Sequence, residues 1–166
     1  GLGQVRRTSE VRRTLHSNTA RATNGGRPYR MEVRMIKKID HIGIVVRDIE
    51  EARRVYEEAL GLEVTHIQEV PEQQVRIAFL PVGESEVELV EPTTADSGVA
   101  RFLEKRGEGI HHICFQVDDI EAALERLRAQ GVIPIDRRPR QGARGRVAFV
   151  HPKSMHGVLV ELVERS

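Results

Sequence analysis

The sequence is poor in cysteine and in aromatic residues, and both shortages exclude classes of protein. Its 166 residues include one cysteine, Cys114, so an internal disulfide and any disulfide-based scaffold are excluded. Tryptophan is absent and aromatic residues make up 4%, which argues against a surface for stacking nucleic-acid bases. No apolar run approaches the ~20 residues that a membrane-spanning helix needs. We therefore expect neither a nucleic acid nor a membrane as a partner.

Outside the N-terminal segment, the sequence also lacks a large excess of positive or negative charge. Residues 1–34 hold eight Arg and two acidic residues, a net charge of +6. Residues 35–166 hold 18 Lys and Arg against 23 Asp and Glu, a net charge of −5. Nucleic-acid binding requires a basic face for phosphate contacts, and this mildly acidic body does not provide the overall charge for one.

Residues 1–34 are predicted to be a tail separate from the folded body, which covers residues 35–166. The tail is rich in Arg, Ser, Thr, Asn and Gly and shows no helical or strand period. Three interpretations remain open: a disordered tail, an extension upstream of a start at Met31 or Met35, or a presequence resembling a transit peptide. The first two favour a cytoplasmic protein, whereas the third favours the mitochondrial matrix.

The body is predicted to contain the same order of elements twice. Each half begins with a strand and a helix and ends with three further strands. In the first half, about 36–92, the strand begins at Ile36, Asp48 caps a helix over 48–60 that ends at Gly61, and strands cover 61–68, 74–81 and 85–92. In the second, about 109–165, a strand covers 109–117, a helix 119–130, and strands 132–139, 144–152 and 156–164. The linker 92–109 contains a predicted helical turn over 99–105.

The two halves also match residue by residue, which indicates an internal duplication. At an offset of 71, eight positions are identical, among them Ile39 with Ile110, His41 with His112 and Asp48 with Asp119. At an offset of 70, Arg76, Ala78 and Phe79 match Arg146, Ala148 and Phe149, and at an offset of 73, Glu88–Glu91 matches Glu161–Glu164. A duplication of this kind predicts two like modules packed about a pseudo-twofold axis, with matched residues facing one another.

The duplication singles out two histidines and two glutamates, His41 with His112 and Glu88 with Glu161. Glu161 interrupts an apolar run, and period-2 alternation places it on the face of Leu159 and Val163, where a lone carboxylate would be costly to bury. Two imidazoles and two carboxylates would form a mixed nitrogen and oxygen site for a divalent metal, without selecting one metal. The alternative is that the histidines cap strands and the glutamates are solvated edge residues.

Several other residues receive structural interpretations. Strand alternation places His111 on the face opposite to His112, and the small Gly43 should leave room beside the imidazole of His41. Cys114 is predicted to be a small buried thiol. The basic segment 137–146 is either a solvated loop or a phosphate-binding lip, in which Gly142 and Gly145 would let a phosphate approach the backbone, with Lys153 as a further contact.

Four segments carry a resemblance to a known family. They are residues 40–64, 71–92, 107–124 and 142–164, which include DHIGIVV, GIHHICF, HPKS and GVLVEL. These segments resemble the methylmalonyl-CoA epimerase family of the vicinal oxygen chelate superfamily, over roughly residues 36–164. The resemblance implies an α+β fold of the glyoxalase/bleomycin-resistance type, in which two paired βαβββ modules form a cupped mixed sheet.

The resemblance also implies a site, a cofactor and a partner. Metal ligands fall on His41, Glu88, His112 and Glu161, the quartet that the duplication selects. The implied cofactor is a divalent ion, with cobalt the first choice and Zn, Ni, Mn or Mg as alternatives, and the implied assembly is a homodimer. Several members place a Glu where Ile77 stands in this sequence, so the identity of a second acid–base group is open.

The implied reaction is the interconversion of (2R)- and (2S)-methylmalonyl-CoA, a step of propionate metabolism. The metal would stabilise an enolate formed by removal of the C2 proton, and Glu161 and Glu88 are the predicted catalytic groups. Gln73, Arg144 and Lys153 are the predicted contacts to the CoA thioester. The alternatives are a glyoxalase-I-like lyase, a ring-cleaving dioxygenase, and a metal-free binding or resistance protein on the same scaffold.

Overall fold

The computed structural model describes residues 23–24, 27–28 and 35–166, and the chain divides into two units, Gly1–Val33 and Arg34–Ser166. In the first unit, Thr23–Asn24 (β1) pairs antiparallel with Arg27–Pro28 (β2). The rest of the predicted tail lies outside the described residues, so its three interpretations stay predictions. All further features belong to the second unit.

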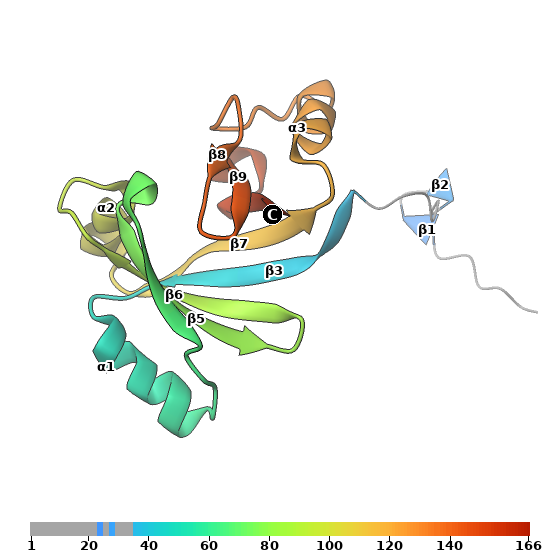
Figure 1. Cartoon of the computed structure of the whole chain (residues 1–166). Coiled ribbons are helices and arrows are strands. Elements are labelled where there is room, and N and C mark those ends of the chain that lie inside the picture. The colour runs from blue at the N-terminus through green and yellow to red at the C-terminus, as the bar shows by residue number, and fades with distance from the viewer. Residues whose placement is uncertain (1–22, 25–26, 29–34) are drawn as a thin grey trace, which may run out of the picture. The chain divides into compact units, whose positions relative to one another are not determined.

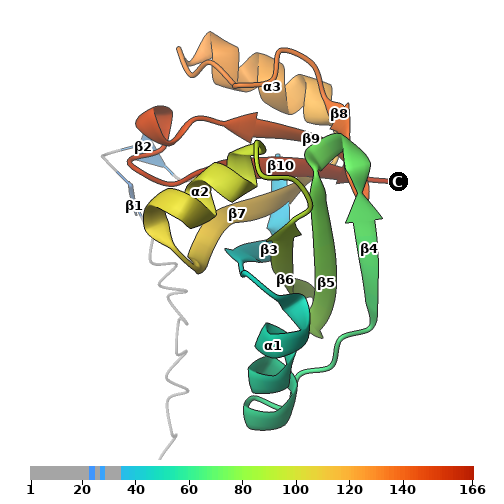
Figure 2. The same cartoon turned by 90° about the vertical axis from the view of Figure 1, so that its left-hand side faces the viewer.

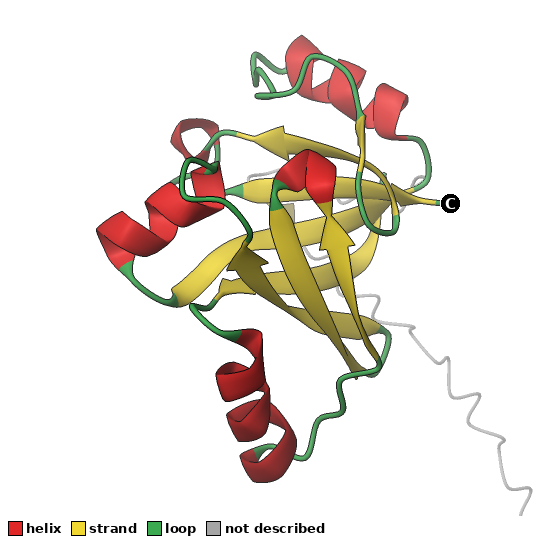
Figure 3. Ribbon diagram, turned by 60° about the vertical axis from the view of Figure 1, so that its left-hand side comes forward, coloured by secondary structure: helices red, strands yellow, loops and turns green. Residues whose placement is uncertain are grey.

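The second unit contains one curled sheet of eight strands in the order β4-β5-β6-β3-β7-β10-β9-β8 (Figures 1 and 3). The central pair, β3 and β7, runs antiparallel, and each of these strands is parallel to the last strand of its own half, β6 or β10. The order is therefore symmetric about the β3–β7 pair, which confirms the α+β prediction with its repeated βαβββ unit. The strands are β3 (Ile36–Val45), β4 (His66–Val70), β5 (Val75–Val82), β6 (Ser85–Pro92), β7 (Gly109–Val117), β8 (Arg140–Gln141), β9 (Gly145–Val150) and β10 (Val160–Arg165).

One capped helix covers the outer face of the sheet in each half. Asp48 precedes α1 (Ile49–Arg54) and accepts hydrogen bonds from the amides of Glu50 and Glu51, at 2.8 and 3.2 Å. Asp119 precedes α3 (Ile120–Ala129) and accepts one from the Ala122 amide at 3.0 Å. Because these side chains satisfy amides that a helix leaves unpaired, both helices begin at the predicted residues.

In both halves, alternate side chains along each strand point to opposite faces of the sheet: an outer face covered by a helix and an inner face. Figure 2 shows α1 and α3 beside the sheet. The residues that pack against α1 are Ala78, Leu80 and Leu89, and those that pack against α3 are their repeat partners Ala148, Val150 and Leu162. Residues next to these in the strands, such as Ile77 and Val147, point to the inside of the curl instead. Burial of the outer face against helices thus fixes which residues face inward.

The linker between the halves forms a longer helix than the sequence predicted. It contains α2 (Gly98–Arg106), capped by the Ser97 hydroxyl, which accepts a hydrogen bond from the Ala100 amide at 3.0 Å. Val99, Phe102 and Leu103 of α2 pack against buried valines of β3, β5 and β6. No helix among the described residues is long and apolar enough to cross a membrane.

Three local predictions were wrong. The helix predicted over 48–60 is α-helical only to Arg54. It then widens into a π-helical turn, Val55–Ala59, in which the Leu60 amide donates to the Val55 carbonyl and Val55 is 60% exposed. The strand predicted over 61–68 begins only at His66. Of the strand predicted over 132–139, a single bridge from Pro134 to Val150 remains, because Pro134 and Pro139 lack the amide hydrogens that a ladder requires.

Candidate metal centre and active site

The inside of the curled sheet encloses a cavity of about 370 Å³ between the two halves. Repeat-related residues line it from both sides: Ile77, Glu88 and Val90 from the first half, and Val147, Glu161 and Val163 from the second. The lining is mixed, because aliphatic side chains alternate with polar and charged groups that converge on the cavity, and a concave site of this kind suits a small molecule that carries both apolar and polar parts.

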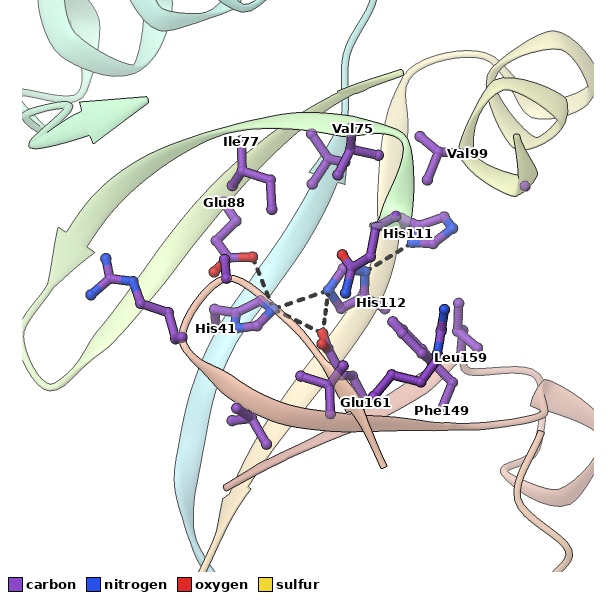
Figure 4. A pocket seen from close by; sticks show the side chains of 18 of the residues that line it. His41, Val75, Ile77, Glu88, Val99, His111, His112, Phe149, Leu159 and Glu161 are labelled. Atoms are coloured by element: carbon purple, nitrogen blue, oxygen red, sulfur yellow. Dashed lines mark hydrogen bonds and ion pairs between the residues drawn. The ribbon is translucent and has the colours of Figure 1, made fainter. Parts of the chain in front are cut away.

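Four of those polar groups meet at one point (Figure 4). His41 Nε2 lies 3.1 Å from Glu88 Oε2, 3.1 Å from Glu161 Oε2 and 3.0 Å from His112 Nε2. His112 Nε2 lies 2.9 Å from Glu161 Oε2. The structure thus brings together the four side chains that the duplication singled out, each from a different strand.

All four side chains of this quartet are buried, with exposures of 4 to 6%. Burial raises the pKa of Glu88 to about 7. Burial would also raise the pKa of Glu161, but hydrogen bonds to His112 and His41 hold it below the usual range. Burial opposes a charged His41, yet bonds to Asp40, Cys114 and Glu161 raise its pKa. The quartet therefore attracts positive charge to its centre.

The donor atoms of the quartet fit a divalent metal ion. Two imidazole nitrogens and two carboxylate oxygens are a ligand set that suits Co, Zn, Ni, Fe and Mn. His41 also has the outer partner that metal-bound histidines usually have, because its Nδ1 lies 2.8 Å from Asp40 Oδ1. A second group, Asp40 with His41 and Cys114, is less suited, since burial raises the pKa of the Cys114 thiol and keeps it protonated.

Asp40 belongs to a chain of ion pairs that the sequence analysis missed. Arg165 donates to both Asp40 oxygens, at 2.7 and 3.1 Å, and also to Glu86 at 3.1 Å. Burial alone would raise the pKa of Asp40, but hydrogen bonds with His41 and Arg165 lower it to about 2. Asp40 is 1% exposed, so it remains a buried anion behind His41. An acid directly before a selected histidine was the signal in the sequence.

Two β-bulges in the central strand pair bring the residues before the histidines to the site. The β3–β7 register skips Asp40 between Ile39 and His41, and it skips His111 between His112 and Ile110. A bulge inserts one unpaired residue and re-aims side chains, so strict alternation fails at these two places. The prediction that His111 faces away from His112 is therefore wrong: their Nδ1 atoms lie 2.8 Å apart.

Gly43 does leave room for an imidazole, but it is the ring of His112 rather than that of His41. Gly43 lies opposite His112 in the β3–β7 register, and a Cβ atom at Gly43 would lie 2.2 Å from His112 Cε1. We expect Gly43→Ala to displace the His112 ring and weaken cobalt binding at least ~10-fold, as loss of a well-oriented ligand does. Isothermal titration calorimetry with Co²⁺ measures this, with Gly98→Ala at the start of α2, where a Cβ would have nothing within 4 Å, as the control.

Of the three predicted substrate contacts, two lie in the cavity wall and one does not. Gln73, in the short 3-10 helix Pro71–Gln73, and Arg144 both line the cavity. Arg144 lies over the Phe79 ring at 4.4 Å and donates to Glu86 at 3.0 Å. Lys153 lies in the 3-10 helix Pro152–Ser154 and is not among the described residues that line the cavity.

The two glycines of the basic segment serve the chain's own packing, while their role toward a phosphate stays a prediction. A Cβ at Gly145 would lie 2.1 Å from the Glu164 carbonyl oxygen, and one at Gly142 would lie 2.8 Å from Val147 Cγ1. Part of the basic charge is also paired within the body, because Arg146 bonds to Glu121 and Glu164. The absence of a side chain at these two positions is therefore required for the close contacts of the segment with its neighbours.

The comparisons with known proteins agree with this geometry. The sequence profile of the Glyoxalase/Bleomycin resistance protein/Dioxygenase superfamily matches residues 40–149. The ethylmalonyl-CoA/methylmalonyl-CoA epimerase of Cereibacter sphaeroides is 41% identical over 131 residues, which cover 77% of this chain and 98% of that protein. The chain belongs to the methylmalonyl-CoA epimerase family. The resemblance in sequence is thereby confirmed.

Solved structures of this family have the same fold. The methylmalonyl-CoA epimerase of Mycobacterium tuberculosis superposes with a TM-score of 0.78 at 35% identity, covering 83% of this chain and 94% of that one. A methylmalonyl-CoA epimerase in complex with methylmalonyl-CoA and NH4+ gives a TM-score of 0.76 at 41% identity, with coverage of 79% and 96%. The glyoxalase-type fold predicted from the resemblance is therefore confirmed.

Ile77 stands where the resemblance to the epimerase family led us to expect a second acidic residue. It is 4% exposed and lines the cavity beside Glu88 and Val90. An aliphatic side chain at this position cannot carry a proton, so any second acid–base group must come from another residue of the cavity.

Proposed function

We propose that this protein is a metal-dependent epimerase that interconverts (2R)- and (2S)-methylmalonyl-CoA. The observation that carries the proposal is the buried quartet, in which His41, Glu88, His112 and Glu161 converge from the two halves on one point of the cavity. The family membership supplies the substrate class, because the relatives are named for methylmalonyl-CoA.

The reaction requires removal and return of the proton on C2 of the substrate, between the thioester and the carboxylate. A divalent ion in the quartet would supply Lewis-acid stabilisation of the negative charge that this removal creates. His41, Glu88, His112 and Glu161 are the proposed ligands. Their positions on strands would hold the reacting centre in one orientation.

The two glutamates are proposed as the proton carriers. To do so, each would release the ion: Glu161, as a carboxylate, would take the proton from C2 on one side, and Glu88, as a carboxylic acid, would give its own proton to the other side, so that the configuration inverts. Proton exchange with solvent would then return both groups to their starting states, and no net proton is consumed. Their repeat-related positions in β6 and β10 place them on opposite sides of the pseudo-twofold axis. Since Ile77 carries no proton, Glu88 takes the role of second acid–base group.

The remaining parts of the cavity are proposed to bind the rest of the CoA thioester. Gln73 and Arg144 line its wall and offer hydrogen bonds to the acyl group and the thioester arm. Lys153, on the exposed 3-10 helix, is proposed to reach the CoA phosphates outside the cavity. We further propose that the metal is cobalt, that the enzyme takes part in propionate metabolism, and that it is a homodimer, for which sedimentation should give twice the 18.8 kDa of one chain.

A direct assay tests the proposed function. Protein loaded with Co²⁺ is mixed with (2R)-methylmalonyl-CoA in deuterium oxide, and mass spectrometry with chiral analysis follows deuterium at C2 and formation of the 2S form. We expect both to occur. A glyoxalase-I-like lyase would instead convert the hemithioacetal of glutathione and methylglyoxal and leave methylmalonyl-CoA unchanged, and that result would overturn the proposal.

A further inference from the structure

The two histidines of the quartet have different partners behind them. His41 Nδ1 faces the Asp40 carboxylate at 2.8 Å, whereas His112 Nδ1 faces the Nδ1 atom of His111 at 2.8 Å. Asp40 and His111 occupy the same place in the two halves, one residue before the histidine and at the unpaired residue of a bulge. The two halves thus keep a hydrogen-bonding residue at the same position behind each histidine, but in one half it is a carboxylate and in the other an imidazole.

The facing nitrogens of His111 and His112 restrict the tautomers of both rings. At 2.8 Å, one Nδ1 must donate and the other must accept, because two protons or two lone pairs would repel each other. If His112 directs an Nε2 lone pair to a metal, its proton is on Nδ1, and His111 must accept it with an unprotonated Nδ1. The proton of a neutral His111 then lies on its Nε2.

We propose that His111 is a positioning residue, which accepts a hydrogen bond from His112 Nδ1 and so fixes His112 in the tautomer and orientation that bind the metal ion. This inference rests on the proposed metal-dependent function. It assigns to His111 the part that Asp40 plays for His41, but with a neutral acceptor in place of an anion. His112 is consequently the less electron-rich of the two imidazole ligands.

The surroundings of His111 hold its ring at this place. Its ring meets the Phe102 ring of α2 edge-on, with centroids 4.9 Å apart at 82°. Figure 4 shows the ring directed to His112 from the side of α2 rather than into the centre of the quartet. His111 is therefore fixed between an aromatic contact and a ligand, and it does not itself reach the metal position.

Two substitutions separate hydrogen bonding from packing. His111→Phe keeps a planar ring against Phe102 but removes the acceptor, and His111→Asn places an amide oxygen close to the position of the original Nδ1. We expect His111→Phe to weaken Co²⁺ binding ~10- to 100-fold, the usual effect of removing an outer partner, and His111→Asn to restore it to within ~3-fold of wild type. Competition with a chromophoric chelator measures the affinities. His66→Phe is the matched control, because His66 also stacks on a phenylalanine ring, Phe79, at 4.4 Å.

A measurement on the wild-type protein makes the test independent of variant folding. With Zn²⁺ bound, long-range ¹H–¹⁵N correlation spectra should show His112 protonated at Nδ1 and His111 protonated at Nε2. Detection of a proton on His111 Nδ1, or equal Co²⁺ affinity of wild type and His111→Phe, would overturn the positioning role. Failure of the wild-type protein to bind any divalent ion would instead refute the proposed function, so the two failures are distinguishable.

Discussion

Replacement of Glu161 by Gln should abolish epimerisation, with a loss of about 10³-fold, the middle of the range for removal of a general acid–base group. Glu161 lies 2.9 Å from His112 and 3.1 Å from His41 at the centre of the quartet, and its pKa is held low by those bonds despite its burial. Gln keeps the shape of the side chain but cannot accept the C2 proton. The measurement is the rate of deuterium incorporation at C2 of each epimer, separately, by mass spectrometry.

The comparison with Glu88→Gln makes this experiment specific. If each carboxylate serves one face of C2, Glu161→Gln should retain exchange with one epimer and Glu88→Gln with the other, while neither variant interconverts the two. Glu164→Gln, in the same strand as Glu161 but bonded to Arg146 outside the quartet, should behave as wild type. Undiminished exchange of both epimers by cobalt-bound Glu161→Gln would remove Glu161 from the chemistry. The same result for Glu88→Gln would assign the second group to another residue.

Removal of the divalent ion should abolish the activity and lower the stability together. Four polar side chains with 4 to 6% exposure meet at the centre of the quartet, and burial of such groups is unfavourable unless positive charge compensates it. An ion that binds only the folded chain, at a concentration 1,000 times its Kd, adds ~4 kcal/mol to the free energy of unfolding. For a chain of this size, that corresponds to a rise of ~10 °C in Tm.

Differential scanning calorimetry with and without Co²⁺ measures this change, and elemental analysis determines the stoichiometry. Protons compete with the ion for the two imidazoles, so the rise in Tm should shrink as the pH falls. His41→Ala should remove most of the metal-dependent rise, because it deletes the donor that contacts the other three members of the quartet. His66→Ala should leave the rise unchanged. A Tm that does not respond to Co²⁺, Zn²⁺, Ni²⁺ or Mn²⁺ in the wild-type protein would contradict a metal site in this cavity.

Much of the architecture could be predicted because the chain carries the same pattern twice. Asp48 and Asp119 mark both helix starts by capping chemistry, which depends only on residues two or three places away. Predictions failed where local pattern did not determine the outcome. The helix predicted over 48–60 ends in a π-helical turn at Val55–Ala59, and the prolines Pro134 and Pro139 reduce the strand predicted over 132–139 to one bridge. At the prolines, the missing amide hydrogens outweighed the hydrophobic pattern of the segment.

The sequence by itself determined the duplication and the fold that follows from it. It also determined the quartet of His41, Glu88, His112 and Glu161, because identical residues at equivalent places in two like modules face one another across a pseudo-twofold axis. Only the tertiary structure decided what stands behind those ligands. The bulges at Asp40 and His111 arise in the pairing of two strands that lie 71 residues apart, and strand alternation, which is a property of one strand alone, predicts the wrong face for His111. The ion pairs from Asp40 to Arg165 likewise join opposite ends of the body, so no local pattern could show them.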